Sequence, residues 1–373
     1  CLYGVDIQSI ATQVTKLRFF ISLIVDQTMD RRRANFGVRP LPNLETKFVT
    51  ADSLIRVERP RNQGELSEIA EVSSLQRELK QVRHSLFSAK TPRTKNKYRE
   101  RDKELRDAIA EELKENGWAS DDAEKLAAWD PYDQNASAPY FDPEWMFGLK
   151  LFDIVIGNPP YIQIQKFSKD QKDKWVAQGY QTYAASADIY CLFYERGAQL
   201  LREGGHLCYI TSNKWMRTGY GKKLRGFLSS KMDTRLVLDF GMAQNFSAAT
   251  TYTCIVAAVK EPSSGITRSC YATDDRAAMS NPRNYFEANF ITQEALGSST
   301  WVVLSRERLR VKEAVEAQGV PLKRWSISIN YGVKTGLNDA FYLTQEERDE
   351  LVSIDPVCED FLVPLLRGRK IDP

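Results

Sequence analysis

Apolar residues follow two spacings along the chain, and each predicts a different element. At residues 9–25, Leu17, Phe20, Ile21 and Ile24 recur every three or four positions and predict an amphipathic helix. Helices are also predicted at 188–201 and 221–229. Short segments rich in apolar residues predict strands at residues 1–6, 46–50, 152–156, 206–210, 236–240 and 253–259. This alternation predicts an α/β fold with a doubly wound, Rossmann-like sheet.

Residues 63–117 carry a helical pattern that is rich in charge. Pro92 interrupts it, and a second helix is predicted from Lys95 to Asn116, so we expect a helical hairpin. Residues 77–106 hold eleven basic and four acidic side chains, a net charge of +7. This charge is enough for a phosphate-facing surface, and it also fits a solvated helical face. The candidate phosphate contacts are Lys90, Arg93, Lys95, Lys97 and Arg99.

Composition narrows the class of protein. At 373 residues the chain is long enough for two domains, and its overall net charge of +3 says little about partners. The six cysteines lie far apart, without a Cys-x-x-Cys pair, and there are two histidines, which argues against a zinc site or a disulfide framework. We therefore predict no metal site. No apolar run approaches the length of about 20 residues that crosses a membrane, and we expect a soluble, cytoplasmic protein.

The strongest chemical signal is the segment 157–162, Gly-Asn-Pro-Pro-Tyr-Ile, at the end of a predicted strand. Open α/β sheets bind ligands at the carboxyl ends of their strands. Two prolines fix the backbone there, so the Pro159 carbonyl and the Asn158 side-chain oxygen can both accept hydrogen bonds. Two such acceptors suit an exocyclic amine, and Tyr161 offers a flat face for a base lifted out of a duplex. The alternative is a proline-rich turn in which Tyr161 only packs.

Asn-Pro-Pro-Tyr after such a strand resembles the adenine-N6 DNA methyltransferases of the gamma arrangement, which use S-adenosylmethionine. The resemblance implies that Asn158, Pro159, Pro160 and Tyr161 form the catalytic turn and that Tyr161 stacks on a flipped adenine. It also implies that residues 3–7 and 50–54 carry cofactor-binding positions. The implied cofactor-binding positions are Asp6, Ile7 and Asp52, together with Asn158 of the turn. Residues 244–246 suggest a further contact to the base, through Phe246.

Residues 141–147 and the charged hairpin resemble one subgroup, the large type IIG restriction–modification and phage-defence enzymes. Residues 331–341 and 366–369 resemble the start of their target-recognition domain. The resemblance implies double-stranded DNA as the partner, with nuclease and recognition domains elsewhere in a longer chain. The family's glycine-rich cofactor loop, expected before Tyr3, is missing, so we expect an internal fragment.

The resemblance and the spacing of the motifs divide the chain into four parts. Asp52 and Asn158 are 106 residues apart, against roughly 30–40 for a plain strand–helix–strand unit, which indicates an insertion. Residues 1–60 are the predicted cofactor-side part of the methyltransferase domain, and residues 61–150 are the hairpin insertion. Residues 151–322 are the predicted catalytic part, and residues 323–373 are a truncated recognition domain.

Two other functions stay open at this point. Protein glutamine-N5 methyltransferases also use Asn-Pro-Pro-Tyr on a similar sheet, although their chains are shorter and have no recognition domain. A non-catalytic DNA-binding fragment would fit the missing cofactor loop. A glycine-rich loop about 20–30 residues before Tyr3 would decide for the enzyme.

Overall fold

The computed structural model describes residues 2–38, 40–57, 70–241, 252–272, 275–327 and 342–364. The chain divides into two compact units, residues 1–310 and 311–373. Residues 331–341 and 366–369, which resemble a recognition domain, lie outside the described residues, and so does Phe246. The predicted division into four parts therefore stays a prediction.

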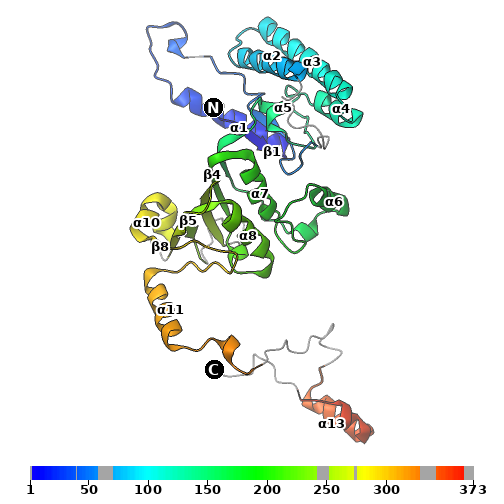
Figure 1. The fold of residues 1–373 in the computed structure, drawn as a ribbon, viewed down its shortest axis with the longest axis vertical. Helices are drawn as coiled ribbons and strands as arrows, with labels where there is room; N and C mark the ends of the chain where they lie inside the picture. Colours follow the sequence, from blue (N-terminus) through cyan, green and yellow to red (C-terminus); the bar gives the residue numbers. More distant parts are fainter. Residues whose placement is uncertain are drawn as a thin grey trace. The chain divides into compact units, whose positions relative to one another are not determined.

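The first unit alternates strands and helices, as predicted (Figure 1). Its strands are β1 (Gly4–Asp6), β2 (Phe48–Thr50), β3 (Phe152–Gly157), β4 (Leu201–Ser212), β5 (Asp233–Asp239), β6 (Thr253–Val259), β7 (Ile266–Tyr271) and β8 (Ile291–Glu294). Its helices are α1 (Ser9–Val25), α2 (Ala70–Phe87), α3 (Pro92–Glu115), α4 (Ser120–Ala128), α5 (Pro143–Phe147), α6 (Lys169–Ala177), α7 (Tyr190–Leu200), α8 (Lys222–Lys231), α9 (Asp275–Ser280) and α10 (Pro282–Asn289). Helix α11 (Arg306–Gln318) crosses the boundary between the units, and α13 (Gln345–Ile354) lies in the second unit.

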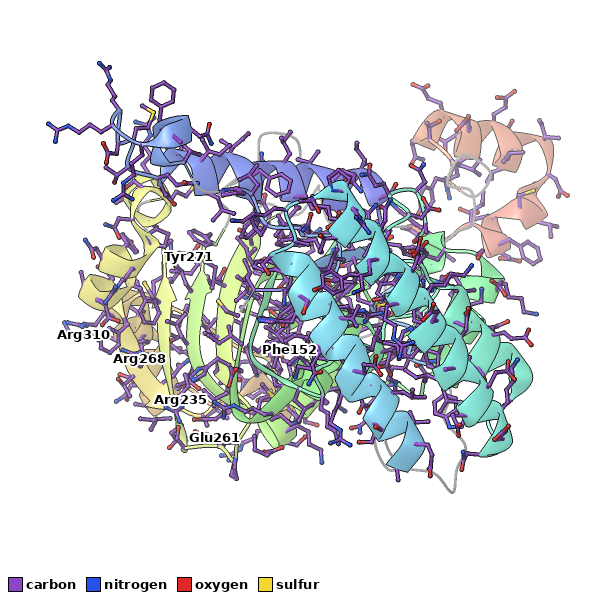
Figure 2. All side chains as sticks on the ribbon, turned by 90° about the horizontal axis from the view of Figure 1, so that it is seen from above. Phe152, Arg235, Glu261, Arg268, Tyr271 and Arg310 are labelled. Carbon is purple, nitrogen blue, oxygen red and sulfur yellow. The ribbon has the colours of Figure 1, made fainter. Side chains whose placement is uncertain are left out.

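The main sheet has six strands in the order β3-β4-β6-β5-β7-β8. It is mixed, because β3 runs parallel to β4 and β5 parallel to β7, whereas the other three pairings are antiparallel. The labelled Arg235 of β5 and Glu261, just past β6, form an ion pair at one end of these strands (Figure 2).

Helices cover both faces of the main sheet, because alternate side chains of a strand point to opposite faces. Val237 belongs to the core that α7 and α8 share with β4, whereas its neighbour Leu238 belongs to the core under α9 and α10. The predicted α/β fold with helices on both faces is confirmed.

Strands β1 and β2 form a separate parallel pair, which shares a hydrophobic core with α2, α3, α4 and α5. The predicted hairpin is present, but Pro92 does not interrupt a helix. It is the first residue of α3, where a missing N–H costs nothing, and the Thr91 side chain caps the helix by accepting from the Thr94 amide. Helices α4 and α5 were not predicted, since both are short.

Helix α1 has the predicted bounds, but the apolar face of this helix is not its buried face. Leu17, Ile21 and Ile24 are exposed. The helix meets β2 instead through Thr12, whose hydroxyl is 2.9 Å from that of Thr50, and through Phe19, which packs on Phe48. Periodicity locates a helix, but the neighbouring elements decide which face they cover.

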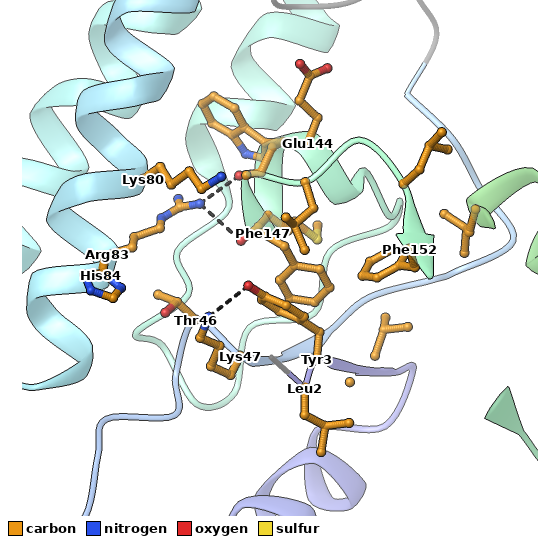
Figure 3. A pocket seen from close by; sticks show the side chains of 18 of the residues that line it. Leu2, Tyr3, Thr46, Lys47, Lys80, Arg83, His84, Glu144, Phe147 and Phe152 are labelled. Carbon is orange, nitrogen blue, oxygen red and sulfur yellow. Dashed lines mark hydrogen bonds between the residues drawn. The ribbon is translucent and has the colours of Figure 1, made fainter. Parts of the chain in front are cut away.

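A cavity of about 1340 Å³ lies between β1 and β3, which are not hydrogen-bonded to each other. Figure 3 shows Tyr3, just before β1, with Phe147 of α5 and Phe152 of β3 on its wall, and the Lys47 ammonium donates to the Tyr3 hydroxyl. Ile154 and Ile156 of β3 also line it and are 62% and 71% exposed. Among the described strands, β3 is at the edge of the main sheet and pairs with β4.

Among the described residues, no helix combines the length and apolar character needed to cross a membrane.

Candidate functional site

The Asn-Pro-Pro-Tyr turn leaves β3 at its carboxyl end, as the sequence predicts. Asn158 is exposed and Pro159 is buried. The chain after the turn is tied to the segment before α7, because the Ile162 carbonyl accepts from the Ile189 amide at 2.8 Å and the Ile164 amide donates to Ala187 at 2.9 Å. The turn is thus held at both ends, by the sheet and by the start of α7.

Tyr161 lies directly against Asn158. Its hydroxyl is 2.8 Å from Asn158 Oδ1, to which it donates, and 3.3 Å from the carbonyl oxygen of Ile210 at the end of β4. Its ring meets that of Tyr190 edge to face, with centroids 6.1 Å apart. Burial raises the pKa of Tyr161 to about 12, so the phenol keeps its proton at ordinary pH. The hydroxyl therefore acts as a donor that orients the Asn158 amide.

The two predicted cofactor acids come together at the ends of neighbouring parallel strands. Asp6 ends β1 and is in register with Thr50, two residues before Asp52. One Asp6 oxygen accepts from the Gln8 amide at 2.8 Å. The Asp52 carboxylate accepts from the Leu54 amide at 3.0 Å and from Gln171 Nε2 at 3.4 Å. Ile7, predicted beside Asp6, is exposed.

Burial raises the pKa of Asp52, while its hydrogen bonds with Leu54 and Gln171 oppose the shift. Gln171 comes from α6, which follows the Asn-Pro-Pro-Tyr turn in the chain. This contact joins the end of β2 to α6.

Sequence reasoning missed two residues that support this region. The Arg196 side chain of α7 is buried and donates to the Ser53 and Phe141 carbonyls, both at 2.8 Å. Tyr190 of α7 lies against Tyr161, and its hydroxyl is 2.9 Å from that of Tyr220. Both residues act through contacts more than 25 residues away in the sequence, so the residues beside them do not predict these roles.

The cations of the predicted hairpin surface lie at a different edge. The hairpin turn is bound by Asn43, whose side chain donates to the Leu86 and Ala89 carbonyls at 2.6 and 3.0 Å. Arg99 pairs with Glu45 at 3.2 Å and its guanidinium lies over the ring of Tyr132.

Asn43 and Glu45 precede β2, whereas Asp52 follows it. The turn that carries Lys90 and Arg93 is therefore beside the entry of β2, and the structure does not bring it to the strand ends that hold Asn158 and the acids. The role of Lys90, Arg93, Lys95, Lys97 and Arg99 in binding DNA stays a prediction.

The cavity between β1 and β3 is not this site. It is lined by residues of β1 and β3, but Asp6, Asp52 and Asn158 are not among its lining residues. Its polar wall includes Lys80 and Glu144, whose side chains do not converge on one point (Figure 3).

The side chains at the strand ends suit the cofactor that the sequence implies. The Asp6 carboxylate is exposed at the end of β1, an arrangement that suits the two vicinal hydroxyls of a ribose. The partly buried Asp52 carboxylate can accept from an amine such as that of adenine. The carboxylate oxygens of both residues therefore fit the nucleoside part of S-adenosylmethionine.

Acids at the ends of two neighbouring parallel strands, with an Asn-Pro-Pro-Tyr turn at the end of a third, place the chain among the α/β methyltransferases. Residues 1–246 match the Eco57I restriction-modification methylase family, and the chain belongs to that family. The predicted resemblance to the methyltransferase part of restriction–modification enzymes is thereby confirmed.

Curated relatives support the same assignment. The chain is 32% identical over 156 residues to the type II restriction enzyme and methyltransferase RM.Eco57I of Escherichia coli. This match covers 41% of the chain and 15% of the relative. It is 25% identical over 231 residues to the type II methyltransferase M.PaeR7I of Pseudomonas aeruginosa, a match that covers 59% of this chain and 39% of that relative. The chain thus spans well under half the length of these relatives.

Solved structures give remote likenesses. One is a nuclease-deletion mutant of the type ISP restriction-modification enzyme LlaGI in complex with a DNA substrate mimic. It has a TM-score of 0.40 at 12% sequence identity, and the match covers 83% of this chain and 25% of that chain. The type IIG restriction endonuclease BpuSI has a TM-score of 0.34 at 16% sequence identity, and the match covers 58% of this chain and 29% of that chain. At these scores the likeness carries no argument about function.

Proposed function

We propose that this chain is the methyl-transferring part of a restriction–modification enzyme, which moves a methyl group from S-adenosylmethionine to N6 of adenine in double-stranded DNA. The observation that carries the proposal is the turn after β3, where Asn158 Oδ1 is held by the Tyr161 hydroxyl at 2.8 Å. Family membership supports the methylase class. The chemistry of the turn supports an exocyclic amine as the acceptor, and the choice of adenine N6 rests on the resemblance of the Asn-Pro-Pro-Tyr turn to the adenine-N6 methyltransferases.

The turn presents two acceptors to an exocyclic amine. Asn158 Oδ1 has two lone pairs, so it can accept from Tyr161 and from one amine N–H at once, while the Pro159 carbonyl can accept from the other N–H. Both hydrogen bonds draw the nitrogen lone pair out of conjugation with the ring. The amine nitrogen then becomes nucleophilic enough to attack a methyl carbon.

The cofactor supplies an activated methyl group on a sulfonium. As the new N–C bond forms, the electron pair of the S–C bond leaves with sulfur, and the nitrogen afterwards loses one proton to water. In this proposal the carboxylates of Asp6 and Asp52 hold the nucleoside part of the cofactor. The ring of Tyr161 lies against the flipped base.

The test is Asn158→Ala in the full-length protein, assayed by transfer of tritiated methyl groups to DNA. Losing one of two placed acceptors costs on the order of 3 kcal/mol of transition-state stabilisation, which is a fall of about a hundredfold in rate. Asn96→Ala, which removes an exposed amide from the hairpin, is the matched control and should keep the parent rate.

Two outcomes would contradict the proposal. Tritium that enters protein glutamine in place of DNA adenine would point to a protein glutamine-N5 methyltransferase. DNA binding without any methyl transfer by the full-length parent would point to a non-catalytic DNA-binding protein.

A further inference from the structure

A second cationic segment follows β4, the strand that pairs with β3. Between Asn213 and Lys231 the chain has six Lys or Arg residues and no Asp or Glu. The first part of this stretch, residues 213–223, is named here the cationic loop. It follows the end of β4, contains the 3-10 helices η4 (Lys214–Met216) and η5 (Gly219–Gly221), and leads into α8.

The backbone of the cationic loop is held in place from inside. The buried Arg225 guanidinium donates to the carbonyls of Trp215 and Thr218, and also to that of Ser298. A Cβ at Gly221 would lie 1.9 Å from the Trp215 carbonyl oxygen, so this close approach requires glycine. The positive charge of Arg225 is therefore used within the fold, to present the rest of the loop in one shape.

Other cations of the loop face solvent. Lys214 and Lys222 are exposed, and in the part of the chain that the structure describes neither forms an ion pair. Arg217 is also exposed and lies 3.7 Å from the buried Asp239. Lys223 donates to the Tyr183 carbonyl at 2.8 Å. The loop thus offers at least two cations without a neutralising partner.

Contacts between tyrosines join the loop to the catalytic turn. The hydroxyl of Tyr220, in η5, is 2.9 Å from that of Tyr190, and the Tyr190 ring packs edge to face on Tyr161. The Tyr220 hydroxyl also donates to Asp188, beside the segment that binds the turn. The cationic loop is therefore one tyrosine removed from Tyr161.

We propose that the cationic loop binds the phosphates of the DNA strand that carries the target base, with Lys214 and Lys222 as the contacts. The inference rests on the proposed function and adds where the DNA backbone lies. Lysine contacts to phosphates position a protein on DNA without reading the sequence, and they make affinity depend on salt. A rigid loop beside the turn can hold the backbone while one base enters the site.

The experiment measures binding of the full-length protein to a labelled duplex by fluorescence anisotropy at several salt concentrations. Each phosphate contact contributes about 0.9 to the slope of log affinity against log salt. The double variant Lys214→Gln/Lys222→Gln should therefore flatten the slope by about 1.8. The charge-preserving variant Lys214→Arg/Lys222→Arg should keep the parent slope.

The matched control removes the same charge from another exposed segment, as Arg31→Gln/Arg32→Gln, and we expect it to keep the parent slope. A parent-like slope in the loop variant overturns the inference, and so does equal flattening by both pairs, which would mean that total charge alone sets the slope. Binding is measured apart from methyl transfer. A loop-dependent slope in a protein that transfers no methyl group would overturn the proposed function and leave the loop assignment standing.

Discussion

Asn158 and Tyr161 act as a pair, because the phenol gives its single proton to the amide oxygen that is proposed to bind the target amine. A hydroxyl at 2.8 Å fixes the rotation of the Asn158 side chain, so one of its lone pairs keeps a set direction. The Tyr161 hydroxyl is therefore a positioning group as well as part of a stacking residue. The raised pKa of about 12 keeps it a donor throughout the neutral range.

Tyr161→Phe should lower kcat about fivefold, since a hydrogen bond of this kind contributes about 1 kcal/mol. KM for DNA should change little, because the ring that contacts the base remains. Steady-state methyl transfer between pH 7 and about pH 9 measures both constants, and Tyr98→Phe on the hairpin is the control. A kcat equal to that of the parent would show that the hydroxyl does not orient Asn158.

Among the elements, the α2–α3 hairpin is held to the first unit by a buried ionic cluster. Asp102 of α3 is fully buried and contacts the Arg83 guanidinium of α2 at 2.7 Å, that of Arg106 at 2.9 Å and the Tyr132 hydroxyl at 2.9 Å. Arg83 also donates to two carbonyls of α5 (Figure 3). Burial opposes ionisation of Asp102, but the two arginines more than offset it and lower the pKa of the carboxyl.

Asp102→Asn should lower the free energy of unfolding by about 3–5 kcal/mol, because it removes the counter-charge that contacts both buried guanidinium groups and leaves Arg106 with Asp130 at 3.8 Å. Urea denaturation followed by circular dichroism measures this change. The exposed Glu78→Gln, which removes a partner of Arg101, should have little effect. Parent-like stability of Asp102→Asn would mean that the cluster does not hold the hairpin.

The lowered pKa also sets a direction for pH. The contribution of Asp102 is fully present above the unfolded value of about 3.9, and it is lost as pH falls through the lower folded value. The stability difference between parent and Asp102→Asn should therefore shrink only in acid.

At the scale of the whole molecule, the two units have different kinds of packing. The first unit holds the hydrophobic cores, whereas the described helices of the second, such as α13, bury no side chain. Removing residues 319–373 should leave the melting temperature of the first unit unchanged, because no core residue is lost. Differential scanning calorimetry of the two chains checks this. A lower melting temperature in the shortened chain would show that the second unit supports the first.

The sequence by itself determined the elements that depend on local order. The periodicity of residues 9–25 predicts α1 with its observed bounds, and the run 253–259 predicts β6 with its own. The position of Asn158 at the end of β3 is also a local property, because an apolar run followed by two prolines must end a strand there. Asp6 and Asp52 meet because parallel strands bring their carboxyl ends to one edge.

Only the tertiary structure decided which surfaces and groups lie together. Leu17 and Ile21 of α1 form an apolar stripe, yet packing on β2 leaves them exposed. The hairpin carries a net charge of +7 over residues 77–106, but its turn is bound by Asn43 at the entry of β2, away from Asn158. The contacts that join Tyr161 to Tyr190 and Tyr220 span up to 30 residues, and no local pattern encodes such distant pairs.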